Sequence, residues 1–328
     1  MSEPLGFLAP LLADPQIEEI IVLGGRRTFV VRDGEKALLP DVVDPDRVRL
    51  IADALLAGTG RRLDLAAPIV SAQLADGSRV HITGPPVTHP DRLNIMIRKF
   101  VMRGARLDDL VVRGTLTSSA ADFLARAVRD DRTILVAGAP GAGKTTLLSC
   151  LLHEVDPDRR VVTCEEVFEV GADLPDMTQM QTRDQGLDGG GAVTLRELVR
   201  ASLRQRPDLI VVGEVRGPEA LDMVLALNAG CCGMATLHAN SAIDALDKLI
   251  GYCVLAADNV AIPFVRKAVA ASVDVVVFLR RTPDGRRIEE IAEVTGGIDG
   301  DTIVTRAAFS RAMGSLRWTG RPEAETCA

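Results

Sequence analysis

Lysine is scarce in this sequence, whereas arginine is common. Of the 38 basic residues in the 328-residue chain, only five are lysines: Lys36, Lys99, Lys144, Lys248 and Lys267. The 38 basic residues are outnumbered by 45 acidic ones, which leaves a formal net charge of −7. This balance is poorly suited to a generally basic surface that coats nucleic acid, so we do not expect nucleic acid as a partner.

Aromatic residues and paired cysteines are also rare. The chain has 8 Phe, 1 Trp and 1 Tyr, too few to favour a surface on which bases stack. Its 6 cysteines form no C-x-x-C pair, which disfavours a zinc site and favours a reducing compartment. The longest uncharged stretch, 223–243, contains Asn228, His238 and Asn240, so we do not expect it to span a membrane. The acidic start of the chain does not resemble a signal peptide.

The secondary-structure patterns of the sequence divide the chain into two parts. A length about twice that of a typical domain predicts two domains. Residues 1–104 include a helical pattern near 46–58, a hairpin turn at 75–79 and a strand over 93–97, which predict an α+β domain. The charged stretch 101–114 has a glycine near each end and is typical of a linker. From residue 116 helices alternate with short apolar strands, so residues 105–328 predict an α/β domain with a mostly parallel sheet.

One glycine-rich segment indicates a phosphate-binding loop. It reads G-A-P-G-A-G-K-T and lies between a predicted buried strand over 133–137 and a predicted helix from 146 to about 155, which is the expected context of G-x-x-x-x-G-K-[ST]. The glycines let successive N–H groups point at phosphate oxygens, and the helix N-terminus adds its dipole. We expect Lys144 to reach the β- and γ-phosphates of a nucleoside triphosphate and the Thr145 hydroxyl to complete a Mg²⁺ shell. The predicted nucleotide-binding residues are Gly138, Ala139, Pro140, Gly141, Ala142, Gly143, Lys144, Thr145 and Thr146.

Three further predicted strands end in residues suited to this chemistry. The strand over 209–213 ends at Glu214, whose carboxylate we expect to bind the Mg²⁺ shell or orient water. The strand over 160–164 ends at Glu165, followed by Glu166 and Glu169. A carboxylate there is suited to activating the attacking water, and a solvated helix start is the alternative. The strand over 234–237 ends at His238, a candidate sensor of the γ-phosphate, although a lone histidine is often structural.

Arginines offer the positive charge that the transition state of phosphoryl transfer requires. Arg196, Arg200 and Arg204 are spaced four residues apart, so they are expected to share one face of a helix. We predict catalytic roles for these three residues, and the alternative is an ordinary solvated cationic face.

These elements, in this order, resemble the secretion ATPase superfamily of type II and type IV secretion, type IV pili and tight-adherence (Flp) pili. The resemblance rests on Walker A at 138–145, an "Asp box" at 162–169, Walker B from 206 to 217 and a "His box" at 236–241. The N-terminal part is also similar, through residues 74–80 and 97–100. The match is closest to the CpaF/TadA branch, and conjugation ATPases share the same layout.

The resemblance implies a hexameric ATPase in which a smaller N-terminal α+β domain is joined to a RecA-like P-loop domain. It implies that ATP binds between the domains together with Mg²⁺, that Glu165 is catalytic, and that Glu214 serves Mg²⁺ and water. Arg79 and Arg98 are similar to N-terminal arginines that reach the phosphates in this family. The implied motor is cytoplasmic, associates peripherally with the inner face of the plasma membrane, and powers pilus assembly or secretion through inner-membrane platform proteins.

Three departures from the family pattern leave other functions open. The family's Asp box usually reads Glu-Asp, whereas this chain has Glu165-Glu166. Its His box usually opens Thr-Gly-His, whereas residues 229–231 read Ala-Gly-Cys. The four-cysteine zinc module of type II secretion and pilus-assembly ATPases is missing, which disfavours those branches. The alternatives are a conjugation-type DNA-transfer ATPase and a nucleotide-responsive scaffold with little turnover.

Overall fold

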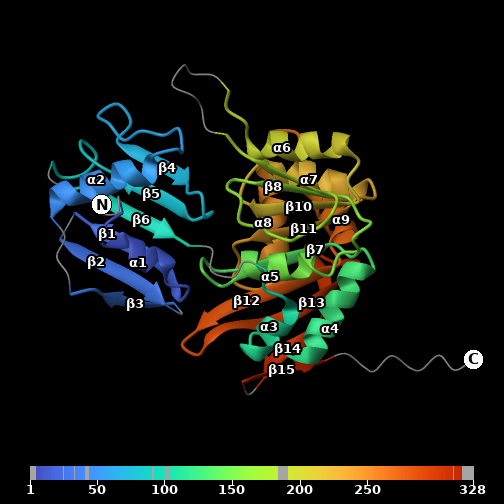
Figure 1. The fold of residues 1–328 in the computed structure, drawn as a ribbon. Coiled ribbons are helices and arrows are strands. Elements are labelled where there is room, and N and C mark those ends of the chain that lie inside the picture. Colours follow the sequence, from blue (N-terminus) through green and yellow to red (C-terminus); the bar gives the residue numbers. More distant parts are fainter. Residues whose placement is uncertain are drawn as a thin grey trace, which may run out of the picture. The chain divides into compact units, whose positions relative to one another are not determined.

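The chain divides into two compact units, Met1–Arg103 and Gly104–Ala328 (Figure 1). The computed structural model describes residues 5–24, 26–32, 34–40, 44–90, 92–99, 104–183, 191–312 and 314–319. Residue 100 of the N-terminal resemblance and residues 101–103 of the predicted linker lie outside these ranges. None of the helices in the described ranges combines the length and apolar character needed to cross a membrane.

The first unit is an antiparallel sheet of six strands packed against helices. The strands are β1 (Ile17–Leu23), β2 (Arg27–Arg32), β3 (Glu35–Leu38), β4 (Ile69–Gln73), β5 (Arg79–Thr83) and β6 (Asn94–Arg98), in the order β3-β2-β1-β6-β5-β4. The helices are α1 (Leu8–Ala13) and α2 (Pro45–Leu56). Val48, Ile51 and Leu55 recur at helical spacing in α2 and are buried against alternate residues of the strands. The predicted α+β class, the hairpin turn at 75–79 and the helix near 46–58 are confirmed.

The second unit is built on a sheet of nine strands in the order β15-β14-β13-β12-β7-β11-β10-β8-β9. The strands are β7 (Ile134–Gly138), β8 (Val161–Glu165), β9 (Met177–Gln181), β10 (Leu209–Val215), β11 (Cys232–Leu237), β12 (Val275–Thr282), β13 (Gly285–Asp299), β14 (Thr302–Ala312) and β15 (Ser315–Trp318). Neighbouring strands from β12 to β9 are parallel, and those from β12 to β15 are antiparallel. The predicted α/β class with a mostly parallel sheet is confirmed, and the antiparallel extension is an addition that we did not predict.

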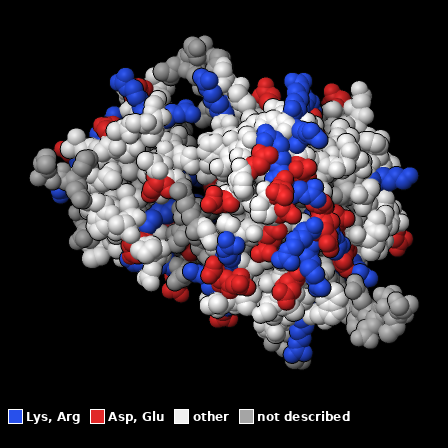
Figure 2. Space-filling view, turned by 45° about the vertical axis from the view of Figure 1, so that its right-hand side comes forward, with Lys and Arg blue, Asp and Glu red and all other residues white. Residues whose placement is uncertain are grey.

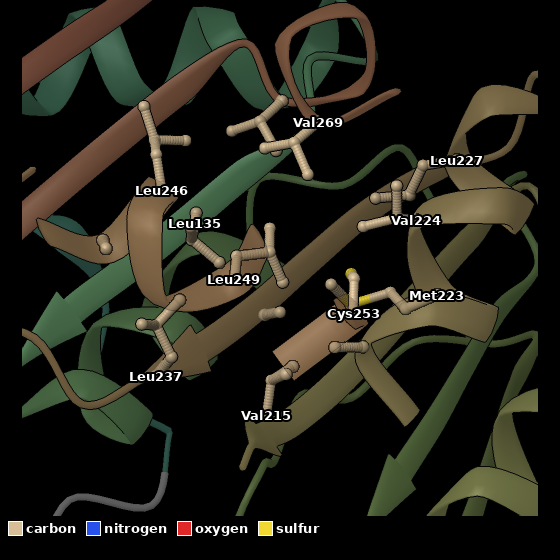
Figure 3. Packing of buried hydrophobic residues seen from close by; sticks show 14 of the residues in the cluster. Leu135, Val215, Met223, Val224, Leu227, Leu237, Leu246, Leu249, Cys253 and Val269 are labelled. Carbon is tan, nitrogen blue, oxygen red and sulfur yellow. The ribbon is translucent and has the colours of Figure 1, made fainter. Parts of the chain in front are cut away.

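Helices cover both faces of this sheet. One group consists of α3 (Leu107–Val112), α4 (Ser118–Arg129) and α5 (Lys144–Leu152), and the other of α6 (Leu195–Ser202), α7 (Glu219–Asn228), α8 (Ala242–Leu255) and α9 (Ile262–Ser272). Figure 3 shows the core beneath the second group, where Leu135 and Leu237 of the strands meet Val224, Leu249 and Val269 of the helices. The two groups lie on opposite faces because successive right-handed crossovers run in opposite directions along the sheet.

The predicted linker over 101–114 is wrong for its second half. Residues 107–112 form α3, which packs against α4 and α5. Leu107 and Leu110 lie three residues apart, on one face of the helix, and both are buried. The acidic side chains at 108 and 109 stabilise the first turn of the helix, where charge of that sign is favourable, so the charged composition marks a helix start here.

Candidate functional site

The carboxyl ends of four parallel strands meet at one edge of the second unit's sheet. β7, β11, β10 and β8 are neighbours in that order. β7 leads into the glycine-rich loop, β11 is followed by His238, β10 contains Glu214 near its end, and β8 ends at Glu165. The expectation that the His238 strand ends at the edge that carries the loop is confirmed by this order. Ligands of open α/β sheets bind at such edges.

The glycine-rich loop joins β7 to α5 in a conformation that depends on its glycines. A Cβ on Gly138 would lie 2.5 Å from the Leu279 carbonyl oxygen of β12, so only glycine fits this close approach. Gly143 has a φ of 97° and forms the N-cap of α5. The helix therefore begins at Lys144, two residues before the predicted start, and its positive dipole end faces the loop.

Lys144, His238 and Glu214 form a chain of contacts at this edge. The ammonium of Lys144 is buried and donates hydrogen bonds to the carbonyl oxygens of Gly138 and Ala139, at 3.2 and 3.3 Å. It also lies 3.0 Å from Nδ1 of His238. The other imidazole nitrogen, Nε2, lies 2.6 Å from Oε1 of Glu214. Nδ1 also lies 3.2 Å from the Gly138 carbonyl oxygen, so this ring nitrogen is close to a donor and to an acceptor.

Among the described residues, the carboxylate of Glu214 has a hydrogen-bond donor at one of its two oxygens. Oε2 accepts from Arg216, which also donates to Glu166 at 3.1 Å. Oε1 is buried and, within the described part of the chain, accepts no hydrogen bond, since its approach to His238 lacks hydrogen-bond geometry. A buried carboxylate oxygen without a donor is expensive unless a cation or a donor from a ligand reaches it. Glu214 therefore has capacity for a ligand.

Glu165 and Glu169 have different surroundings, although four residues separate them. The Glu165 side chain is buried, its Oε1 accepts from the Thr163 hydroxyl at 3.0 Å, and its Oε2 accepts from the N–H groups of Glu169 and Val170 at 2.7 Å each. Burial raises the pKa of Glu165, against the lowering effect of these hydrogen bonds. Thr145 Oγ1 donates to Glu169 at 3.4 Å. Glu169 thus contacts the end of the phosphate loop, and Glu165 accepts the hydrogen bonds that hold the turn before it.

Two of the three predicted arginines contact a carboxylate on the neighbouring helix. Arg196 and Arg200 of α6 donate to the two carboxylate oxygens of Asp222 on α7, at 2.6 and 2.7 Å. The prediction that Arg204 shares their helix is wrong, because α6 ends at Ser202 and a short 3₁₀ helix over 203–205 follows. The chain stops being helical there because the residue before Pro207 is disfavoured in the α region.

In the first unit, Arg79 and Arg98 lie directly opposite each other on β5 and β6. Their side chains therefore share one face of the antiparallel sheet. Arg98 also lies opposite Glu19 of β1, whose carboxylate is 3.9 Å from its guanidinium. The structure thus brings the two predicted phosphate-binding arginines together within their own unit.

Sequence reasoning missed Arg286, which contacts the phosphate loop from the hairpin of β12 and β13. Its Nε donates to the Gly141 carbonyl oxygen at 3.0 Å. The residues Thr-Pro-Asp-Gly at 282–285 are a turn signal that predicts a hairpin pairing Arg281 with Arg286. That signal cannot place the hairpin beside the loop, because the contact depends on β12 pairing with β7.

Comparisons with known proteins agree with this geometry. The family model for "Type II/IV secretion system protein" matches residues 2–296. A candidate conjugal transfer protein of Mycobacterium tuberculosis is 37% identical over 306 residues, which cover 88% of this chain and 83% of the relative. The type IV secretion system protein PtlH of Bordetella pertussis is 33% identical over 309 residues, covering 85% of this chain and 90% of PtlH.

A solved structure shows the same fold. The ATPase DotB of Legionella pneumophila aligns with a TM-score of 0.63 at 17% identity, covering 86% of this chain and 78% of DotB. The second unit accordingly has the RecA-like P-loop fold, with its glycine-rich loop at the switch point of the sheet. The family match over nearly the whole length and the relatives above 30% identity lead to one conclusion: this chain belongs to the type II/IV secretion system protein family.

Proposed function

We propose that this protein is a motor that hydrolyses ATP to ADP and phosphate and powers pilus assembly or secretion. The observation that carries the proposal is the chain of contacts from Lys144 through His238 to Glu214 beside the glycine-rich loop. It joins the cation at the start of α5 to the imidazole after β11 and the carboxylate near the end of β10, and phosphoryl transfer uses such groups for positioning and charge stabilisation. Family membership supports the same activity.

In this proposal water attacks the γ-phosphorus of ATP, and the bond from phosphorus to the bridging oxygen of ADP breaks. The loop N–H groups and the N-terminus of α5 bind phosphate oxygens. Lys144 exchanges its contacts with the Gly138 and Ala139 carbonyls for the β- and γ-phosphates. Because His238 contacts the same ammonium, movement of Lys144 toward phosphate changes the hydrogen bonding of the imidazole, which suits it to sensing the γ-phosphate.

The residues at the loop fit a magnesium ion. Glu214 offers the buried Oε1 that accepts no hydrogen bond from described residues, and Thr145 offers its hydroxyl. Mg²⁺ prefers such oxygen ligands and takes few from the protein, since phosphates and water complete its shell. When bound, the ion would neutralise negative charge that develops on the phosphates.

Two glutamates are candidates for the general base. The resemblance assigns catalysis to Glu165, whereas the contact with Thr145 favours Glu169. We propose that one of them takes the proton from the attacking water, and comparison of the Gln variants of both would identify which. Arg79 and Arg98 are proposed to bind phosphate from the first unit. Catalytic roles are also proposed for Arg196, Arg200 and Arg204. For Arg196 and Arg200, such a role requires that they first leave Asp222.

We further propose a homo-hexamer that works at the cytoplasmic, inner face of the plasma membrane on platform proteins of a pilus or secretion system. The CpaF/TadA tight-adherence branch is the proposed branch, on the motifs that carry the resemblance. On the right-hand part of the face drawn in Figure 2, basic and acidic side chains are intermingled. Ion pairs between elements include Arg129 with Glu154 at 2.8 Å and Arg132 with Glu293 at 3.1 Å. Such interleaved charge favours a protein partner over a track for nucleic acid.

Phosphate release from ATP with Mg²⁺ tests the proposal. The Lys144→Ala variant should lose about a hundredfold or more in turnover, because a charge that acts on the transition state is removed. Lys248→Ala is the matched control, since Lys248 pairs with Asp244 on α8 at 3.1 Å and is expected to keep turnover. Equal activity of wild type and Lys144→Ala would refute the assignment. Nucleotide binding without turnover in the wild type would favour the scaffold.

A DNA-transfer ATPase is the second candidate, because the M. tuberculosis relative is a candidate conjugal transfer protein. DNA binding that weakens steeply with salt and stimulates hydrolysis would favour this function. Hydrolysis that is indifferent to added DNA would favour the pilus or secretion motor.

A further inference from the structure

The hairpin of β12 and β13 lies against the phosphate loop and presents one of its faces to it. Arg281 and Arg286 are cross-strand partners, so their side chains share a face. Arg286 donates from Nε to the Gly141 carbonyl oxygen at 3.0 Å. A Cβ added to Gly143 would lie 3.1 Å from Cδ of Arg286, so the stem of this side chain packs over the glycine that starts α5.

The contact fixes one peptide plane of the loop from both sides. The Gly141 carbonyl accepts from Arg286, while the N–H of the next residue, Ala142, donates to the Ala139 carbonyl at 3.2 Å. Gly141 has a φ of 72° and would otherwise be among the freest residues of the loop. A loop that already has its bound conformation pays less ordering entropy when phosphate arrives.

We propose that Arg286 is a positioning residue of the nucleotide site, which acts by holding the Gly141 carbonyl and thereby preorganising the phosphate loop. This inference rests on the proposed nucleotide-binding function. The hydrogen bond comes from a charged donor, so its loss should weaken ADP binding about tenfold. Turnover at saturating ATP should stay within about threefold, because Arg286 supports ground state and transition state alike.

The experiment uses the full-length protein and three variants. Arg286→Ala removes the donor and the charge. Arg286→Gln removes the charge but keeps an N–H donor, because Nε2 of glutamine occupies the same place along the side chain as Nε of arginine. Arg280→Ala is the matched control. It removes the same charge from the hairpin, but the Arg280 side chain is exposed on the opposite face of β12. The readouts are the Kd for ADP with Mg²⁺ and hydrogen exchange of residues 139–143 without nucleotide.

We expect weaker ADP binding and faster exchange in Arg286→Ala, values between those of Arg286→Ala and wild type in Arg286→Gln, and no change in Arg280→Ala. A Kd within about twofold of wild type in Arg286→Ala would overturn the inference. Equal weakening in Arg280→Ala or in Arg286→Gln would also overturn it, because charge on the hairpin would then explain the effect. A wild type that binds no ADP would refute the proposed function alone. Hydrogen exchange would then decide the inference, and unchanged exchange in Arg286→Ala would overturn it.

Discussion

Two clusters of charged side chains lie in the second unit, one at the phosphate loop and one between α6 and α7. At the loop, Lys144 contacts His238, which contacts Glu214. Between the helices, Asp222 accepts from Arg196 through one oxygen and from Arg200 through the other. Both clusters join residues far apart in the chain, and both contain residues that we predicted to be catalytic.

The clusters differ in what their carboxylates still need. Each oxygen of Asp222 has a guanidinium donor, so the cluster is complete without a ligand. The Oε1 atom of Glu214 is buried and accepts no hydrogen bond from the described residues. Polar groups in a purely structural cluster satisfy one another, whereas a binding site keeps capacity that its ligand completes. Between these two clusters, unmet hydrogen bonding therefore marks a difference that charge alone does not show.

The largest expected effect comes from making the same change in both clusters. Glu214→Gln and Asp222→Asn each replace a carboxylate by an amide of equal shape. The first should reduce ATP turnover about a hundredfold or more while the fold is retained, because a metal or water ligand loses its charge. The second should keep turnover within about threefold and lower the free energy of unfolding by about 1 kcal/mol, because two partly exposed ion pairs are weakened.

Phosphate release and urea unfolding of both variants measure these effects. The comparison fails if Asp222→Asn loses as much turnover as Glu214→Gln, since the helix cluster would then take part in the reaction. It also fails if Glu214→Gln keeps full turnover, since the unmet oxygen would then have no role.

Much of the second unit's fold could be predicted because its parallel strands are buried on both faces. Every residue of β7 and β8 is buried, β7 is an apolar run, and β8 is mostly apolar before it ends at Glu165, so both strands are visible locally. The antiparallel β13 was not predictable in this way. It mixes Glu289 and Glu290 with apolar residues and has many half-buried or exposed positions, so its alternation is weak.

The candidate site was predictable where one short segment carries the chemistry. The spacing from Gly138 to Thr145 is sufficient for the phosphate loop, and parallel strand ends explain why His238 and Glu214 join it. The contacts of Arg286 with the loop and of Asp222 with α6 were not predictable. They depend on strand order and helix packing, which are set by long-range contacts that no local pattern contains.

Glu165 lies at the same sheet edge as Glu214 but, like Asp222, has hydrogen-bond donors at both carboxylate oxygens. Burial raises the pKa of the Glu165 carboxyl above that of a glutamate in water. The folded state therefore favours the protonated acid, and wild type loses stability as pH rises from about 4.5 through the folded pKa. Glu165→Gln does not titrate, so its stability relative to wild type should increase over this range. Each tenfold change in the ionisation constant corresponds to about 1.4 kcal/mol.

Urea unfolding from about pH 3 to about pH 8 measures this difference and leaves room below the usual carboxylate pKa for its control. Glu197→Gln is a control of opposite sign, because hydrogen bonds from the Thr194 backbone and hydroxyl lower the pKa of Glu197. Wild type should lose stability relative to that variant as pH falls through the lowered pKa. A stability difference between wild type and Glu165→Gln that does not change with pH would contradict the raised pKa.

The smallest expected effect belongs to Arg200→Ala. The Arg200 side chain is 57% exposed, and Asp222 keeps its bond to Arg196 when Arg200 is removed. We therefore expect a loss of about 0.5 kcal/mol in the free energy of unfolding and turnover within about twofold of wild type. Arg196→Ala should cost more, because Arg196 is less exposed and also donates to the Ala256 carbonyl. If Arg200→Ala instead abolishes turnover while Asp222→Asn keeps it, the arginine acts on phosphate without its ion pair, and the helix cluster belongs to the catalytic machinery after all.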